Sequence, residues 1–314
     1  MKYFISCDWG TSSFRLRLTE SATKQVQAET KSGQGIAATY ALWKEQPSAD
    51  RILFYCDTIL QQIKLLEEQV GYSLDNLPVI ISGMASSSIG MKELHYKAIP
   101  FNVNNAEFTT HIIPATETCR HQMIIISGVC SANDVMRGEE TILAGCNIEN
   151  TNDEQLFIFP GTHSKHVIIQ NNIVKEIKTY MTGEVFDLLS TKSILSASVE
   201  ADKIMSNNES FIKGIREANT TNFLNSIFHV RTNQLLGVSN KKENYQYLSG
   251  LVIGEELKNI QATNYASVTV VSSGMLLTLY TEALSALGFK DKSRQQDADE
   301  ALIKGQALIS NHYQ

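Results

Sequence analysis

Three acidic residues and an arginine occur close together in residues 131–145, and they are of the types that carry out acid–base chemistry. A capping residue at the start and an apolar end predict a helix here. On such a helix Asp134 and Arg137 lie on one face, with Glu139 and Glu140 a turn further on. A carboxylate there could accept the proton of a hydroxyl group that attacks a phosphate. The helix dipole also favours acidic residues near a helix start without any chemistry.

Asp8 ends a short apolar strand, at a place where it could bind Mg²⁺ directly or through water. A turn of glycine and small hydroxyl residues follows at 10–13, and its backbone N–H groups could bind phosphate. A second strand then alternates apolar residues with Arg15 and Arg17, so a tight hairpin is predicted. Small polar residues suit any hairpin turn, which is the structural alternative. The candidate phosphate ligands of this turn are Gly10, Thr11 and Ser12.

The same pattern occurs a second time, as apolar strands at 156–160 and 166–170 around a turn. A third strand follows each hairpin, at 26–30 and at 173–180. Two such units facing each other across a cleft could hold a phosphate chain from both sides. A lone histidine is often structural and a hairpin lysine can face water. The candidate phosphate ligands of the second turn are Gly161, Thr162, His163, Ser164 and Lys165.

The elements that must position these residues follow from periodicity. Residues 52–70 have helical spacing of apolar side chains, and this helix is expected to pack under the first sheet. A buried strand at 79–81 leads into a loop of glycine and serines at 82–90. Binding loops occur at the carboxyl ends of strands, while a flexible surface loop is the alternative. The candidate substrate ligands of this loop are Gly83, Met84 and Ser87.

Glycines mark three further connections. Gly33-Gln34-Gly35 is expected to be a plain strand-to-helix loop, because no acidic residue follows at the distance that a dinucleotide site needs. Gly250 and Gly254 favour close helix packing. A strand at 268–271 turns at Gly274 into a helix that ends near 287, and a glycine in such a turn lets the backbone approach a flat ring.

Length and composition exclude several classes of protein. The 314 residues, of which 43% are hydrophobic, allow two domains, while a net charge of −6 argues against nucleic-acid binding. No apolar run has the length of a membrane span, so we expect a cytoplasmic protein without membrane contact. Five cysteines without metal-type spacing fit reduced thiols. The common P-loop motif is absent.

Five motifs in order resemble the 2-dehydro-3-deoxygalactonokinases of the actin/hexokinase/Hsp70-like ATPase superfamily. They are the first hairpin, the Gly-Met loop, Arg137-Gly138-Glu139-Glu140, Gly161-Thr162-His163-Ser164-Lys165 and Gly183-Glu184-Val185-Phe186. The resemblance implies an α/β, two-lobed actin-like ATPase (ribonuclease H-like) fold with duplicated lobes around a nucleotide cleft. We expect residues 1–145 to form the first lobe, with 297–314 packing back on it, and residues 146–296 to form the second.

The resemblance also implies ATP-dependent phosphorylation of the terminal hydroxyl of a 2-keto-3-deoxy sugar acid. In that interpretation Asp8 organises Mg²⁺ and the two turns hold the phosphates of ATP. Asp134 or Glu139 takes the hydroxyl proton, and Arg15 and Arg137 face the substrate carboxylate or the transferred phosphate. The Gly-Met loop contacts the sugar acid, and Gly274 borders the adenosine.

The chain departs from the family pattern in the Gly-Met loop. Ser88 stands where the family has arginine, and Met91 where it has tryptophan, which leaves the exact sugar acid open. Two other functions fit the same residues: a phosphohydrolase of the polyphosphate-cleaving type, and a nucleotide-binding regulator without catalysis. A homodimer is a further expectation.

Overall fold

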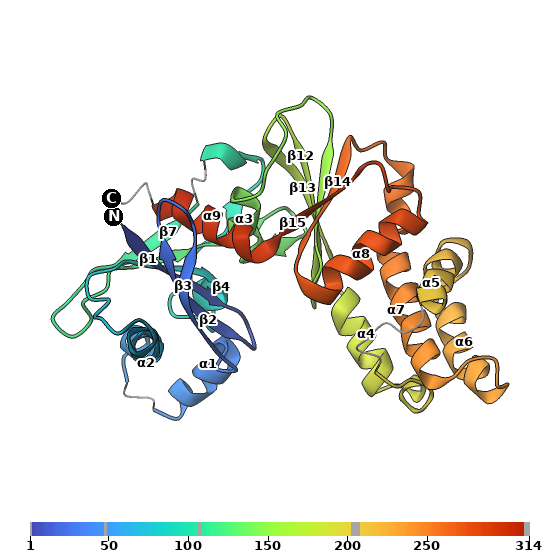
Figure 1. Cartoon of the computed structure of the whole chain (residues 1–314), viewed down its shortest axis with the longest axis horizontal. Helices are drawn as coiled ribbons and strands as arrows, with labels where there is room; N and C mark the ends of the chain where they lie inside the picture. Colours follow the sequence, from blue (N-terminus) through green and yellow to red (C-terminus); the bar gives the residue numbers. More distant parts are fainter. Residues whose placement is uncertain (1, 47–48, 106–107, 202–207, 311–314) are drawn as a thin grey trace. The chain divides into compact units, whose positions relative to one another are not determined.

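The computed structural model describes residues 2–46, 49–105, 108–201 and 208–310. It is a mixed α/β protein that divides into two compact units (Figure 1). The first unit comprises Met1–Glu149, Asn172–Val174 and Ala298–Gln314, and the second comprises Asn150–Asn171 and Lys175–Asp297. Residues 311–314, at the end of the segment expected to pack back on the first lobe, lie outside the described residues.

The first unit is built on a six-stranded sheet with the order β3-β2-β1-β4-β8-β7. The predicted hairpin and its third strand are confirmed: β1 pairs with β2 and β2 with β3, all antiparallel. Strands β4 and β8 extend the sheet parallel to β1, which brings the Gly-Met loop beside the hairpin turn. The strands are β1 (Tyr3–Trp9), β2 (Phe14–Glu20), β3 (Val26–Ser32), β4 (Val79–Gly83), β7 (Thr110–Ile113) and β8 (Met123–Ile126).

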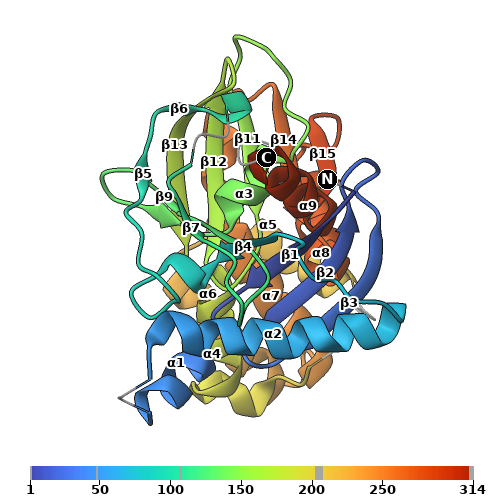
Figure 2. The same cartoon turned by 90° about the vertical axis from the view of Figure 1, so that its left-hand side faces the viewer.

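Helices cover both faces of this sheet (Figure 2). Helices α1 (Ile36–Lys44) and α2 (Arg51–Val70) lie on one face, where Trp9, Tyr55 and their neighbours form the core. This confirms the helix expected under the sheet. Helices α3 (Glu139–Ala144) and α9 (Ala298–Ser310) lie on the other face (Figures 1 and 2).

The helix predicted from the start of 131–145 is wrong in its first half. Val129–Cys130 (β9) and Val135–Met136 (β10) form a short hairpin, and they continue a small sheet with Lys97–Ala98 (β5). The Ser131 hydroxyl accepts a hydrogen bond from the Asp134 N–H at 2.9 Å, so a local turn takes the place of the helix start. The helix begins only after Gly138, whose φ of +108° favours glycine.

The second unit contains the second hairpin and its third strand, as predicted. The sheet order is β15-β14-β11-β12-β13, and the two residues that open β13 pair with β6 within the first unit. Ser164 and Lys165 belong to β12, so the turn is shorter than expected. The strand β15 was not predicted. Strand β6 (Phe101–Asn102) belongs to the first unit. The strands of this sheet in the second unit are β11 (Gln155–Phe159), β12 (Ser164–Gln170), β13 (Ile173–Tyr180, of which the last six residues belong here), β14 (Ser267–Ser272) and β15 (Ser293–Asp297).

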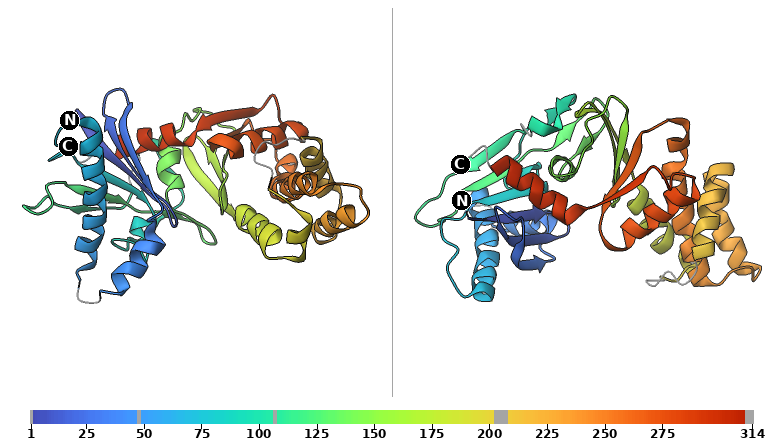
Figure 3. Two further views of the ribbon diagram at one scale, coloured as in Figure 1. Left: turned by 60° about the horizontal axis from the view of Figure 1, so that its bottom comes forward. Right: turned by 45° about the horizontal axis from the view of Figure 1, so that its top comes forward.

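A group of helices packs beside this second sheet (Figure 3). The predicted close packing is confirmed, because a Cβ atom on Gly250 would lie 2.1 Å from the carbonyl oxygen of Phe211 in the neighbouring helix. None of the described helices is long and apolar enough to cross a membrane. The helices are α4 (Thr182–Thr191), α5 (Asn208–Thr220), α6 (Phe223–Leu235), α7 (Lys241–Leu257) and α8 (Gly274–Ala286).

Candidate functional site

The first hairpin turn is fixed on the start of helix α1. The N–H groups of Ile36 and Ala37 donate to the carbonyl oxygens of Gly10 and Thr11 at 3.0 and 3.1 Å. Gly35 allows this contact, because a Cβ atom there would lie 2.4 Å from the Thr11 oxygen. The glycine loop is therefore a strand-to-helix connection, as predicted, and it also holds the turn in place.

The second hairpin turn is held in the same way by helix α4. The Glu184 N–H donates to the Thr162 carbonyl oxygen at 3.1 Å. A Cβ atom on Gly183 would lie 2.6 Å from the Gly161 carbonyl oxygen, so this position also needs glycine. The duplication seen in the sequence therefore includes the hairpin, the strand that follows it and also the helix start that supports each turn.

The side chains of the second turn differ in exposure. Thr162 and His163 are exposed, and His163 Nε2 lies 2.5 Å from Glu184 Oε2. Ser164 is fully buried, so its hydroxyl does not face a bound phosphate. Lys165 is buried as well, and its amine donates to the His163 carbonyl oxygen at 2.9 Å. The lysine therefore does not extend into water, and it places a positive charge at the turn.

Asp8 lies opposite Arg15 on β2 and beside Ser82 on β4. Burial raises its pKa, while the charges of Arg15 and Arg17 act in the opposite direction. Arg15 itself pairs with Asp299 of α9 at 2.6 Å. Within the described residues no group of three or more histidine, cysteine or acidic side chains could hold a metal. A single carboxylate nevertheless fits Mg²⁺, which binds one or two carboxylates together with phosphates and water.

The Gly-Met loop is well packed, which contradicts the alternative of a flexible surface loop. Gly83 has a φ of +92°, and a Cβ atom there would lie 2.7 Å from the carbonyl oxygen of Trp9. Ser86 and Ser87 are buried. The Ser87 hydroxyl oxygen is buried, and it has no hydrogen-bond partner among the described residues.

The two departures from the family loop have different structural outcomes. Met91 is buried in the core of the first unit. Ser88 is exposed, and its carbonyl oxygen accepts a hydrogen bond from Arg51 Nη2 at 2.6 Å. The Arg51 guanidinium lies 5.2 Å from the ring centre of Trp43. Helix α2 thus brings an arginine to this loop, a feature that the sequence did not reveal.

Arg137 joins the Gly-Met loop to the acidic segment. Its Nη1 atom donates to Ser86 Oγ at 3.1 Å, and its guanidinium carbon lies 4.4 Å from the ring centre of Tyr96. The half-buried Glu139 accepts the Arg137 N–H at 3.0 Å. Asp134 lies in the turn between β9 and β10, so it does not share a helix face with Arg137.

Glu140 is the buried member of the acidic segment. Its Oε2 atom accepts the Gly138 N–H at 2.6 Å and its Oε1 atom accepts the Thr141 hydroxyl at 2.9 Å. Burial raises the pKa of Glu140 to about 8, with a further contribution from the charge of Glu139. The carboxylic acid therefore supports the helix start, while Glu139 is the more accessible of the two.

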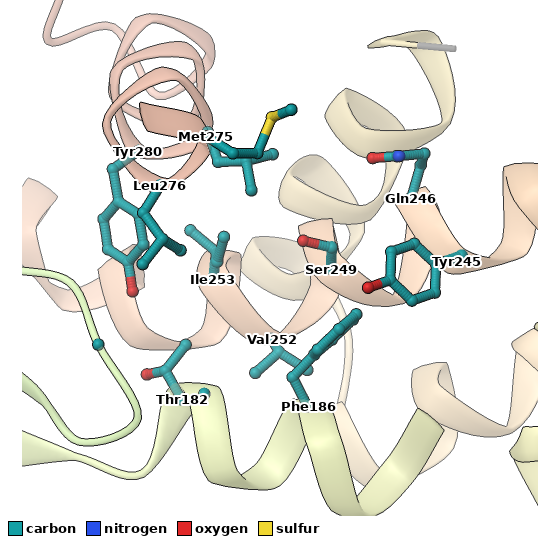
Figure 4. A pocket seen from close by; sticks show the side chains of 13 residues that line it. Thr182, Phe186, Tyr245, Gln246, Ser249, Val252, Ile253, Met275, Leu276 and Tyr280 are labelled. Carbon is teal, nitrogen blue, oxygen red and sulfur yellow. The ribbon is translucent and has the colours of Figure 1, made fainter. Parts of the chain in front are cut away.

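An apolar pocket of about 340 Å³ lies between helices α4, α7 and α8 (Figure 4). Gly161 and Gly183 reach it from the second turn and its supporting helix, so the pocket adjoins that turn. Gly274, the first residue of α8, has a φ of +58° and precedes the lining residue Met275. The other lining residues are Thr182, Phe186, Tyr245, Gln246, Ser249, Val252, Ile253, Leu276, Leu279 and Tyr280.

Glu256 of helix α7 accepts four hydrogen bonds behind this pocket. Ser164 Oγ and His166 Nε2 lie 2.8 Å from its Oε1 atom. The hydroxyls of Tyr280, at 2.6 Å, and of Thr182 donate to its Oε2 atom. The sequence pattern did not predict a role for Glu256, although a carboxylate within the apolar run 248–257 is a signal of it.

Fold and site together define a small-molecule kinase with the actin-like ATPase fold. A model of the 2-keto-3-deoxy-galactonokinase family matches residues 8–309, and the chain belongs to this family. It is a carbohydrate kinase, as the motifs predicted. The two alternatives, a phosphohydrolase and a nucleotide-binding regulator without catalysis, are not favoured.

Relatives agree with this assignment. The chain is 33% identical over 312 residues to "Probable 2-dehydro-3-deoxygalactonokinase DgoK1" of Rhizobium meliloti (strain 1021), covering 96% of this chain and 95% of the relative. It is 28% identical over 294 residues to the 2-dehydro-3-deoxygalactonokinase of Escherichia coli (strain K12), covering 91% and 90%. A crystal structure of a protein described as a 2-dehydro-3-deoxygalactonokinase from Sinorhizobium meliloti matches with a TM-score of 0.83 and 32% identity, covering 99% and 96%.

Proposed function

We propose that this kinase transfers the terminal phosphate of ATP to the terminal hydroxyl of a 2-keto-3-deoxy sugar acid of the 2-dehydro-3-deoxygalactonate type. The observation that carries the proposal is the pocket in the second unit, which Gly161 and Gly183 join to the phosphate-type turn. A nucleoside in this pocket would have its phosphates beside Thr162 and His163. Association of two copies stays a prediction.

The pocket supports the nucleoside part of the proposal. Its walls are mainly aliphatic and aromatic, and its volume falls within the range of roughly 300–1,000 Å³ that is usual for small-molecule sites. Phe186 and Tyr245 pack edge to face, with ring centres 5.1 Å apart, and form one side of it (Figure 4). We assign the flat adenine ring to this space and the turn at Gly274 to its border.

The phosphates and the metal are assigned to the turns and to Asp8. The exposed residues Thr11, Ser12, Thr162 and His163 are the candidate phosphate ligands, together with the backbone at Gly10 and Gly161. Lys165 adds a positive charge at the second turn. Mg²⁺, when bound at Asp8, supplies further charge that offsets the negative charge of the phosphates.

The sugar acid is assigned to the Gly-Met loop and Arg137. The buried Ser87 hydroxyl has bonding capacity to spare, and the Arg137 fork suits a carboxylate or a phosphate. Arg15 keeps the same proposed role, although its pairing with Asp299 makes Arg137 the better candidate. Asp134 or Glu139 accepts the proton of the attacking hydroxyl group. Loss of this proton makes the hydroxyl oxygen a better nucleophile as phosphoryl transfer begins.

The proposal is tested by following ADP formation with a panel of aldonic and 2-keto-3-deoxy sugar acids. We expect ADP to form only with an acceptor, and a phosphorylated sugar acid to be recovered. Release of inorganic phosphate without any sugar acid would identify a phosphohydrolase. ATP binding without turnover on the whole panel would identify a nucleotide-binding regulator.

The variants Asp134→Asn and Glu139→Gln identify which carboxylate is the general base. Loss of a general base typically lowers kcat by about 10²–10⁴-fold. We expect one variant to show this loss with little change in the KM for ATP. Glu68→Gln, which removes an exposed carboxylate of helix α2, is the matched control and should retain the wild-type kcat. Wild-type kcat in both test variants would contradict the assignment.

A further inference from the structure

The Glu256 carboxylate is an expensive group to bury. Its side chain is 1% exposed, within a unit whose core is otherwise largely apolar. Burying an ionised carboxylate costs several kcal/mol unless it is fully hydrogen-bonded. Burial alone raises its pKa, but the hydrogen bond and charge of His166, with the bonds from Thr182 and Tyr280, lower the pKa below its usual value. The carboxylate therefore stays ionised with four donors around it.

Stability alone does not account for this arrangement, because replacing a buried polar cluster by apolar residues is often neutral or stabilising. What the cluster does provide is a fixed geometry, since each donor must point at one of two oxygen atoms. The four donors come from three separate elements: β12, α4 and α8.

Each of these elements contributes to the proposed nucleotide site. Ser164 directly follows the exposed part of the second turn. Thr182 is the first residue of α4 and precedes Gly183, which contacts the turn. Tyr280 and Thr182 both line the pocket (Figure 4). The Glu256 carboxylate therefore links the turn that would face the phosphates of ATP to the pocket wall that would face its adenine ring.

We propose that Glu256 is a positioning residue for the nucleotide, which keeps the second turn, the start of α4 and the pocket wall in one arrangement. The inference rests on the proposed function, because it assigns this turn and this pocket to one ATP molecule. Displacements of about 1 Å in a catalytic site can lower the rate roughly 10²-fold, so a small movement of the second turn is enough to impair nucleotide binding or phosphoryl transfer.

The test is Glu256→Gln, which keeps the size of the side chain but removes the charge and one acceptor oxygen. We expect the KM for ATP and the Kd for ADP to rise by about tenfold or more, with the KM for the sugar acid within about twofold of wild type. The matched control is Glu217→Gln. It removes the charge and one acceptor oxygen from a second histidine–glutamate pair, His229 Nδ1 to Glu217 Oε1 at 2.6 Å, on helices away from the pocket lining.

If Glu256 had a purely structural role, Glu256→Gln would lower the unfolding temperature without changing nucleotide affinity. The KM and Kd values are therefore compared only at temperatures at which circular dichroism shows that every variant is folded. If Glu256→Gln does not fold, Ser164→Ala and Tyr280→Phe each remove one donor, and we expect each to raise the Kd for ADP by about threefold. Wild-type affinity in the folded variants, or an equal rise in Glu217→Gln, would overturn the inference. Failure of the wild type to bind ADP would overturn the proposed function instead.

Discussion

At the scale of single residues, the acidic segment shows how environment separates identical side chains. Glu139 and Glu140 are neighbours in sequence, yet one is half-buried and the other is buried. Burial raises the pKa of Glu140 to about 8, so its protonated form predominates near neutral pH. We therefore assign base chemistry to the more accessible carboxylates and a supporting role to Glu140.

This raised pKa predicts a pH effect on stability. The native state holds the Glu140 proton between the unfolded value of 4.5 and about 8, so wild-type stability falls as pH rises through this window. Glu140→Gln carries no such proton. We expect its unfolding free energy, relative to wild type, to increase by at least about 1 kcal/mol between pH 5 and pH 8, since one pKa unit corresponds to about 1.4 kcal/mol.

Urea unfolding at pH 5, 6, 7 and 8 measures the effect. Glu45→Gln, at an exposed position on the same unit, should show no pH-dependent difference from wild type. A constant difference for Glu140→Gln across the series would mean that the buried carboxyl group does not titrate in this range.

At the scale of elements, each hairpin turn depends on the helix start that packs against it. The contacts occur twice, at Gly35 and at Gly183, with backbone atoms as close neighbours. Backbone cannot move aside as a flexible side chain can. The helix starts therefore determine where the turns lie, and the turns are the proposed phosphate ligands.

Gly35→Ala and Gly183→Ala test this dependence. Each methyl group would lie 2.6 Å or less from a backbone oxygen, and overpacking of this kind typically costs about 1–3 kcal/mol. We expect both variants to unfold at lower urea concentration and to have a higher KM for ATP. Gly33→Ala is the control, because a Cβ atom there has no atom within 4 Å. Equal stability of all three variants would show that the turns adjust freely.

At the scale of the whole molecule, the chain returns to its first unit at the end. Helix α9 packs on α3 so closely that Cβ atoms on Gly145 and Gly305 would lie within 2 Å of backbone oxygens: 1.8 Å from that of Ala301 and 1.9 Å from that of Thr141. The Gln306 amide donates to the Cys7 carbonyl oxygen at 3.0 Å and to Ser82 Oγ at 2.9 Å. The last helix thus stabilises the strands that carry Asp8 and the Gly-Met loop.

Gln306→Met is expected to leave these two acceptors without their buried donor. Loss of a buried hydrogen-bond partner costs about 1–3 kcal/mol, so the variant should unfold earlier in urea. Gln61→Met, on the exposed side of α2, should leave stability nearly unchanged. A Gln306→Met variant as stable as wild type would show that the apolar contacts of α9 suffice.

Local patterns were enough to predict much of this protein. The two hairpins, their third strands, the helix predicted at 52–70 and the strand predicted at 79–81 follow from alternation, helical spacing and turn residues. The structure extends the last two to 51–70 and 79–83. The resemblance of five ordered motifs gave the kinase family that the comparisons support. The error at 131–138 arose because a side-chain hydroxyl and a glycine with positive φ override helix-like composition.

The sequence by itself determined the two hairpins with their third strands, the long helix and the family of the chain, because these depend on periodicity and short motifs. Only the tertiary structure decided that Ser164 and Glu256 belong to one cluster, since the two are 92 positions apart and meet through folding. It likewise decided that Glu140 is buried and that Arg51 reaches Ser88. Burial and long-range hydrogen bonding depend on how distant elements pack together, and no local pattern encodes them.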